Sequence, residues 1–161
     1  MRIAVYPGSF DPVSNGHLDI IERTSKIFDL VYVVVSVNPL KSTLFSVDER
    51  IEMLQTITKH LHNIKVEFTT DLVINYAQEK KASVIIRGLR NTIDYQYEMT
   101  LFSYNQKINK NIETMLLFPS ADNLFLFSSS IKELVIFGGN IHSYVPKELV
   151  DIIEKRIKDQ K

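Results

Sequence analysis

The strongest constraint on the fold of this chain is the regular alternation of two apolar patterns along the sequence. One pattern is a short run of consecutive, mostly β-branched apolar residues. It recurs at Arg2–Tyr6, Leu30–Val37, Ile64–Phe68, Ser83–Ile86 and Glu113–Phe118. Strands of a parallel sheet show this pattern because helices bury both of its faces. The runs therefore predict a parallel sheet of five strands.

The second pattern has the spacing of amphipathic helices and fills the intervals between the runs. Its apolar positions are Leu18, Ile21, Ile27 and Phe28, then Val47, Ile51, Leu54, Ile57 and Leu61, then Leu72 to Ala77, Tyr97 to Ile108 and Ile131–Phe137, and finally Leu149, Ile152, Ile153 and Ile157. Strands that alternate with helices favour an α/β fold with right-handed crossovers. We expect a single, doubly wound, Rossmann-like domain over residues 1–161, with helices on both faces of the sheet and a C-terminal helix from about residue 146.

Local capping signals mark several of the expected helix starts. Ser46 followed by Glu49 has the spacing of a capping box. Asp71 and Asn91 are suitable N-caps for the third and fourth helices. Pro146 suits the first turn of the last helix, where a missing amide proton costs nothing.

Composition narrows the classes of function. Nineteen Lys and Arg residues balance nineteen Asp and Glu residues, so no global attraction to nucleic acid or to an acidic membrane is expected. The longest apolar run, Leu30 to Val35, is far shorter than the ~20 residues of a membrane helix. The absence of cysteine excludes disulfides, thiolate zinc sites and cysteine nucleophiles. With no signal-peptide pattern at its N-terminus, the chain is expected in the cytoplasm.

The segment after the first strand has the features of a phosphate-binding loop. Gly8 and Gly16 allow the backbone to turn sharply and to approach a ligand, and Ser9 offers a hydroxyl group and an amide. His17 falls in the first turn of the next helix, where free amides attract anions. A histidine there can donate a hydrogen bond to a phosphoryl oxygen, more strongly if it is protonated. The alternative is a glycine-rich turn with a surface histidine, and the position at a strand end favours the phosphate site.

Basic and hydroxyl side chains follow other strands at the same edge of the predicted sheet. Lys41 follows the second strand, Arg87 and Arg90 follow the fourth, and the run Ser128–Ser130 follows the fifth. Guanidinium groups offer paired donors to phosphoryl oxygens, and serines that open a helix offer hydroxyls and free amides. The alternatives are solvated surface cations and ordinary helix caps. Because all these basic and hydroxyl residues follow strands at the same edge of the sheet, they instead predict a site that binds polyphosphate.

Two other groups of residues suggest no separate chemistry. His60, His62 and His142 lack the spacing of a metal site, so no metal-binding residues are predicted. The aromatic residues near the fourth helix have no basic stripe beside them, and base stacking is therefore not expected. We assign these residues to the core and to subunit contacts: Tyr95, Tyr97, Phe102 and Tyr104.

Taken together, the motifs resemble those of bacterial phosphopantetheine adenylyltransferases, in the nucleotidyltransferase superfamily. The first segment matches G-[ST]-F-D-x-x-[HT]-x-G-H at Gly8, Ser9, Phe10, Asp11, Gly16 and His17, and Ser14 carries the hydroxyl typical of this branch. The second is Arg-Gly-Leu-Arg at 87–90, followed by Asp94, Tyr95, Tyr97, Glu98 and Met99; the third is the serine run. The loop at 122–127 departs from the pattern, since relatives often have an aromatic residue at Leu124 and isoleucine at Phe127.

This resemblance implies transfer of the adenylyl group of ATP to 4′-phosphopantetheine, which yields dephospho-coenzyme A and pyrophosphate. It implies catalytic roles for His17, Lys41 and Arg90, and phosphopantetheine contacts by Ser9, Lys41, Val73 and Arg87. The implied ATP-binding residues are Ser9, Phe10, His17, Gly88, Leu89, Arg90, Glu98, Leu124, Phe127, Ser128, Ser129 and Ser130. It further implies Mg²⁺ that arrives with ATP rather than in a dedicated protein site, and a homohexamer. The alternatives are an adenylyl- or cytidylyltransferase with another acceptor, such as nicotinamide mononucleotide, and a nucleotide-binding regulatory module without turnover.

Overall fold

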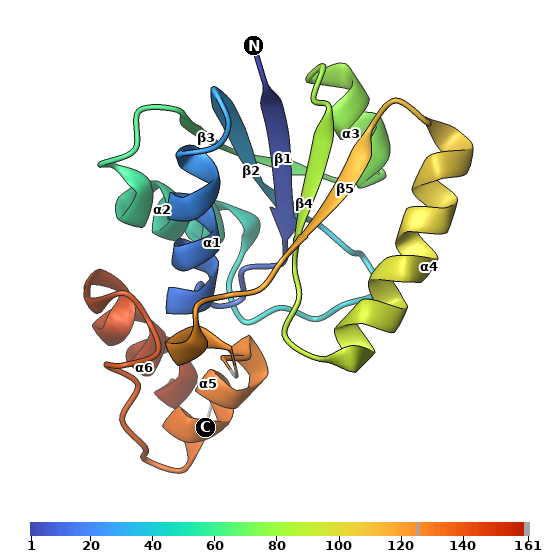
Figure 1. Cartoon of the computed structure of the whole chain (residues 1–161). Coiled ribbons are helices and arrows are strands. Elements are labelled where there is room, and N and C mark those ends of the chain that lie inside the picture. Colours follow the sequence, from blue (N-terminus) through green and yellow to red (C-terminus); the bar gives the residue numbers. More distant parts are fainter. Residues whose placement is uncertain (125, 160–161) are drawn as a thin grey trace.

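A parallel sheet with strand order β3-β2-β1-β4-β5 lies at the centre of the computed structural model, which describes residues 1–124 and 126–159 (Figure 1). The prediction of five parallel strands is confirmed. The strands are β1 (Ile3–Gly8), β2 (Leu30–Ser36), β3 (Ile64–Thr69), β4 (Val84–Gly88) and β5 (Glu113–Leu117).

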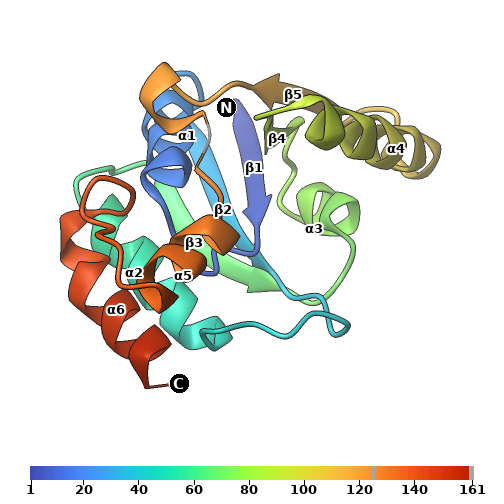
Figure 2. The same cartoon turned by 90° about the horizontal axis from the view of Figure 1, so that it is seen from below.

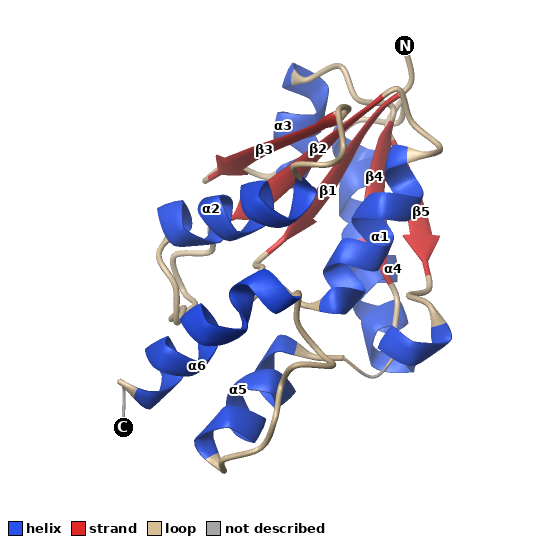
Figure 3. Ribbon diagram, turned by 90° about the vertical axis from the view of Figure 1, so that its left-hand side faces the viewer, coloured by secondary structure: helices blue, strands red, loops and turns tan. Residues whose placement is uncertain are grey.

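Helices cover both faces of this sheet, as expected. The α-helices are α1 (Asn15–Ser25), α2 (Val47–Thr58), α3 (Val73–Glu79), α4 (Thr92–Ile108), α5 (Ser128–Ile136) and α6 (Val150–Lys158), with short 3₁₀ turns η1 (Ala121–Asn123) and η2 (Lys147–Leu149). Viewed from below, α1 and α2 lie on one side of the sheet, and α3 and α4 lie on the other (Figure 2). Helices α5 and α6 pack together beyond one end of the strands (Figure 3). None of the helices in the described residues is long and apolar enough to cross a membrane.

The continuous apolar runs are explained by two cores, one on each face of the sheet. Along β1, Ala4 and Tyr6 pack into the larger core, to which α1, α2, α5 and α6 contribute. Val5, between them, packs into the smaller core with Ile74 and Ala77 of α3. Because successive side chains of a strand point to opposite faces, a strand covered on both sides needs apolar residues at every position.

The strand order creates a switch point between β1 and β4. The chain passes outward from β1 through β2 to β3, and then crosses back so that β4 pairs with the free side of β1. Crossovers leave these two neighbouring strands in opposite directions, which opens a crevice beyond their carboxyl ends. The loop that follows Gly8 and the segment at 87–90 therefore meet at this crevice.

Two of the predicted caps are confirmed. The Ser46 hydroxyl accepts from the Glu49 amide at 3.2 Å, and the Glu49 carboxylate accepts from the Ser46 amide at 2.8 Å, which completes the capping box of α2. The Asn91 side chain caps α4 by accepting from the Asp94 amide at 2.8 Å.

Two other predicted helix starts are wrong. Leu72, not Asp71, is the N-cap of α3; the Asp71 carboxylate lies one residue further out and accepts from the Leu72 amide at 2.6 Å. Pro146 precedes the 3₁₀ turn η2 rather than α6, which begins at Val150. Before α6 the chain makes a 3₁₀ turn, whereas before α3 it stays extended at Leu72.

Helix α4 differs from the other helices in what it exposes. Among its residues, all of which the structure describes, only Glu98 is buried. Tyr97 and Tyr104 are each 59% exposed, and Tyr95 and Phe102 are also exposed. The assignment of these aromatic residues to the core is therefore wrong. Their assignment to subunit contacts stays a prediction.

Candidate active site

A cavity of about 840 Å³ lies at the carboxyl ends of β1, β2 and β4. It brings together residues from segments that are far apart in the sequence, as the motifs predicted. The predicted site residues that line it are Ser9, His17, Lys41, Val73, Arg87, Gly88, Arg90 and Glu98. The imidazole of residue 17 and the guanidinium of residue 90 thus face one cavity.

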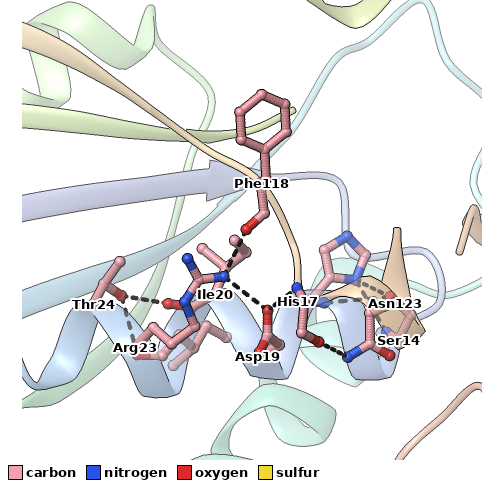
Figure 4. Close-up of polar contacts among 10 residues, drawn as sticks. Ser14, His17, Asp19, Ile20, Arg23, Thr24, Phe118 and Asn123 are labelled. Carbon is pink, nitrogen blue, oxygen red and sulfur yellow. Dashed lines mark hydrogen bonds and ion pairs between the residues drawn. The ribbon is translucent and has the colours of Figure 1, made fainter. Parts of the chain in front are cut away.

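The start of α1 fixes the orientation of the His17 ring. Ser14 is the N-cap, and its backbone amide donates to His17 Nδ1 at 3.0 Å (Figure 4). The Ser14 hydroxyl lies 3.0 Å from the same nitrogen. Because Nδ1 accepts a hydrogen bond from an amide, the neutral ring carries its proton on Nε2. Nε2 is therefore the atom of His17 that can donate to a ligand.

The charge state of His17 follows from its surroundings. Burial, together with the nearby Arg90 guanidinium, lowers the pKa of His17 to about 4. Both effects disfavour the protonated ring, since removal from water and a neighbouring cation each penalise a positive charge. His17 is therefore neutral near pH 7, and the sequence-based option of a protonated donor does not apply at that pH.

In the loop between β1 and α1, Phe10 supports the His17 ring. The Phe10 side chain is fully buried, and its ring packs edge-on against the rings of His17 and Tyr6, with centroid distances of 5.0 and 5.6 Å. A Cβ atom on Gly8 would lie 2.9 Å from the Phe10 ring, so this close packing requires glycine. Phe10 was predicted to bind ATP; the whole residue is buried and lies outside the cavity lining, so this contact stays a prediction.

The guanidinium group of Arg87 is paired with the carboxylate of Glu98. Arg87 Nε donates to Glu98 Oε2 at 2.8 Å and Nη2 donates to Oε1 at 2.6 Å, which is a bidentate pair. Glu98 is 5% exposed, and Arg87 also donates to the Pro7 carbonyl at 3.3 Å. A buried carboxylate needs such a partner. The pair joins α4 to the end of β4 and fixes the plane of the Arg87 guanidinium at the cavity wall.

Arg90 is held by contacts on several sides. Its Nε donates to Asp94 at 3.0 Å, its Nη1 donates to the Leu126 carbonyl at 3.3 Å, and its guanidinium stacks 4.3 Å from the Phe127 ring centroid. A planar guanidinium suits this combination of an ion pair and aromatic stacking. Arg90 therefore links the segment after β4 to the loop before α5.

Lys41 lies in a more open part of the site. Residues 38–43, the Lys41 loop, are all exposed, and two short-range hydrogen bonds to Asn38 shape its turn. Within the described part of the chain, the Lys41 ammonium group makes no hydrogen bond or ion pair. It is therefore a solvent-exposed cation at the mouth of the cavity.

Helix α1 also holds the loop that follows β5. Arg23 donates to the Phe118 carbonyl at 2.6 Å and to Asp19 at 3.1 Å, and the Ser120 amide donates to Asp19 at 2.9 Å (Figure 4). These contacts hold the segment after β5 against α1. Further along the same segment, Asn123 and Leu126 line the cavity. Arg23 and Asp19 are spaced i, i+4 on a helix, a pattern that also occurs on solvated surfaces.

The remaining predicted ATP-binding residues lie outside the cavity lining. They are Leu89, Leu124, Phe127, Ser128, Ser129 and Ser130. The Ser128 hydroxyl donates to the Pro12 carbonyl at 2.8 Å, whereas Ser129 and Ser130 are exposed in the first turn of α5. Contacts between these residues and a nucleotide stay predictions, and Phe125 of the same loop lies outside the described residues.

Several charged residues support the backbone of the site, and sequence reasoning gave none of them this role, although Asp11 was part of the first motif. Asp11 accepts from the amides of Leu44 and Phe45, each at 2.9 Å, and from Lys132 at 2.6 Å. Arg50 is 2% exposed and donates to the Ser9 carbonyl at 2.8 Å. A signal for Arg50 was present, because it falls on the apolar stripe of its helix, where a charged residue must have buried partners.

Comparisons with known proteins agree with these motifs. The family model described as "Cytidylyltransferase-like" matches residues 5–134. A phosphopantetheine adenylyltransferase of Clostridium botulinum is 47% identical over 161 residues, which cover all of this chain and 98% of the relative. The enzyme of the same name from Clostridium novyi is 47% identical over 156 residues, 96% of this chain and 97% of the relative.

Solved structures with the same fold are more distant in sequence. A putative nicotinate-nucleotide adenylyltransferase from Vibrio parahaemolyticus aligns with a TM-score of 0.73 and 20% identity, covering 95% of this chain and 99% of that chain. The Plasmodium falciparum nicotinic acid mononucleotide adenylyltransferase aligns with a TM-score of 0.69 and 17% identity, covering 96% and 95%. These likenesses show the fold alone. The full-length relatives show the family: the chain belongs to the phosphopantetheine adenylyltransferases, within the cytidylyltransferase-like nucleotidyltransferases.

Proposed function

We propose that this chain transfers the adenylyl group of ATP to the phosphate of 4′-phosphopantetheine, with dephospho-coenzyme A and pyrophosphate as products. The observation that carries the proposal is the single cavity that gathers His17, Lys41, Arg87 and Arg90 at the switch point of the sheet. The names of the full-length relatives give phosphopantetheine as the acceptor and adenylyl as the transferred group, which supports ATP as the proposed donor.

The chemistry of this reaction calls for positioning rather than for a strong base. The attacking group is a phosphate that is already anionic, so no proton has to be removed to create the nucleophile. The main obstacles are the repulsion between two anions and the charge on the α-phosphoryl group in the transition state. Fixed hydrogen-bond donors and cations reduce the repulsion between the two anions and stabilise the charge of the transition state. The cavity supplies such groups on two sides.

We assign the roles as follows. Neutral His17 donates from Nε2 to an α-phosphoryl oxygen, at the point where charge accumulates. Ser9 and Lys41 orient the attacking phosphate, and Arg90, with Ser129 and Ser130, steadies the leaving pyrophosphate. Arg87, whose plane Glu98 fixes, and Val73, at the start of α3, complete the phosphopantetheine side.

Mg²⁺ fits this site as a companion of the polyphosphate. The carboxylates that line the cavity are already engaged by neighbours: Glu98 by Arg87, Asp94 by Arg90, and Asp71 by Leu72 and Asn75. We therefore expect the phosphate oxygens of ATP to supply most of the ligands of the ion. When bound, Mg²⁺ would neutralise charge on the polyphosphate.

The exposed apolar side chains of α4 support self-association. Ile93, Tyr97, Met99, Tyr104 and Ile108 are all at least half exposed on one helix. Apolar clusters of this kind on a small protein mark interaction sites. Together with the family resemblance, they support a homohexamer. We also expect the protein in the cytoplasm.

The test is an ATP-dependent assay with 4′-phosphopantetheine in which the product is identified by mass. We expect dephospho-coenzyme A and one pyrophosphate per product. Parallel reactions with nicotinamide and nicotinate mononucleotides test the alternative acceptors. Turnover of a mononucleotide but not of phosphopantetheine would contradict the proposal, and tight ATP binding without any pyrophosphate release would indicate a regulatory module.

A further inference from the structure

Residues 44–46, the loop anchor, join the exposed Lys41 loop to α2. The Phe45 side chain is buried in the larger core, and charged side chains bond to the backbone of the segment on both sides. At its other end the Lys41 loop leaves the sheet, where the Val37 amide donates to the Thr69 carbonyl at 2.9 Å. The position of Lys41 therefore depends on two attachments, one in the sheet and one at the loop anchor.

On its inner side, the loop anchor is fixed by residues of the site itself. Asp11 accepts the amides of Leu44 and Phe45, and Arg50 donates to the Ser46 carbonyl at 3.2 Å. Because Asp11 belongs to the loop after β1 and Arg50 donates to the Ser9 carbonyl of that loop, the backbones around Ser9 and Lys41 share a common support.

On its outer side, the loop anchor is fixed by the C-terminal helix. Arg156 of α6 donates to the Leu44 carbonyl at 3.2 Å, and its guanidinium lies 5.1 Å from the centroid of the Phe45 ring. It also forms a bidentate ion pair with Glu49, the residue that closes the capping box on Ser46. The ion pair lowers the pKa of Glu49, which keeps this carboxylate charged.

We infer that Arg156 is a positioning residue for phosphopantetheine binding: by holding the loop anchor from α6, it sets the reach of Lys41 toward the acceptor phosphate. This inference rests on the proposed function and extends it to the C-terminal helix, which contributes no residue to the cavity lining. Arginine suits the role because its planar fork bonds the Glu49 carboxylate and the Leu44 carbonyl together.

The main test compares steady-state kinetics for both substrates. Arg156→Ala should raise the KM for phosphopantetheine about tenfold, with kcat and the KM for ATP nearly unchanged, since it weakens binding on one side of the cavity. The KM for phosphopantetheine of Arg156→Lys should lie between the values of the wild type and of Arg156→Ala. The matched control is Lys158→Ala, which removes a cation of the same helix that pairs with Glu154 and not with the loop anchor.

A double variant separates positioning from general stability. If Arg156 acts through Lys41, Arg156→Ala should add less than about twofold to the KM in a Lys41→Ala background, because coupled residues are not additive. The inference would be contradicted if Arg156→Ala raised the KM for phosphopantetheine equally in the wild type and in Lys41→Ala. It would also be contradicted if Arg156→Ala raised the KM values for phosphopantetheine and for ATP equally.

Amide hydrogen exchange tests the same point without relying on activity. Exchange at residues 40–45 should be faster in Arg156→Ala than in the wild type, and unchanged in Lys158→Ala. Unchanged exchange in both would overturn the inference even if the enzyme is active. Failure of the wild type to use phosphopantetheine would instead overturn the proposed function.

Discussion

The two sides of the cavity differ in how firmly their functional groups are held. On one side, His17 is fixed by the Ser14 cap and the Phe10 ring, and Arg90 is fixed by an ion pair and by stacking. On the other side, Lys41 stands on an exposed loop attached only at its ends. The difference suggests that the fixed side stabilises charge during transfer, whereas the open side admits and captures the acceptor.

Removal of the His17 donor should have the largest effect. His17→Ala should lower kcat about 10²–10³-fold, the usual loss for one donor to a developing charge, with smaller changes in both KM values. His17→Gln, which keeps an N–H donor, should retain part of the rate. The exposed His62→Ala serves as the control. An alanine variant with full turnover would remove His17 from the mechanism.

The low pKa of His17 should also appear in the stability of the protein. The folded pKa of about 4 lies below the ordinary 6.5, so the unfolded state binds more protons between these pH values. Stability should therefore fall as the pH falls through this window, by about 3 kcal/mol from this group alone. Denaturant unfolding at pH 7 and pH 4 should show a smaller loss for His17→Gln than for the wild type; an equal loss would contradict the shift.

The Arg87–Glu98 pair should contribute to the stability of the folded protein. Glu98→Ala leaves a partly buried guanidinium unpaired, and we expect a loss of about 1–2 kcal/mol in the free energy of unfolding. Arg87→Ala in the same chain should recover part of this loss, because it removes the unpaired charge. Additive losses in a double-mutant cycle would show that the two side chains act independently.

Substitution on the open side should change substrate binding without changing the stability of the protein. Lys41→Ala should raise the KM for phosphopantetheine by about tenfold, the equivalent of one exposed charge-assisted contact, while the midpoint of thermal unfolding stays constant. Titration calorimetry with each substrate gives the comparison. A selective loss of ATP affinity would reverse the assignment of the two sides.

The contrast between the two sides also explains what the sequence could predict. Apolar runs and helical spacing predicted the sheet, and the position of each motif after a strand predicted that His17, Lys41, Arg87 and Arg90 would meet. Parallel strands bring their carboxyl ends to one edge, so local patterns sufficed. The supports were harder to predict: Lys132 and Arg156 are ordinary surface cations by their local spacing, and only tertiary packing reveals that they hold Asp11 and the loop anchor.

The exposed face of α4 marks another limit of sequence reasoning. Tyr97 and Tyr104 have the spacing and composition of core residues, yet both are more than half exposed and line the cavity, and only Glu98 is buried among the described residues of α4. A pattern of apolar residues indicates a surface to be covered, but does not say whether the same chain or another copy covers it.

The most direct test of the account is the state of the His17 ring, measured by ¹⁵N NMR of the imidazole nitrogens between pH 7 and pH 4. We predict a neutral ring with its proton on Nε2 at pH 7, an unprotonated Nδ1, and no titration until the pH approaches about 4. A titration midpoint near 6.5, or a proton on Nδ1 at pH 7, would contradict the claim that the fixed side of the cavity presents a neutral donor.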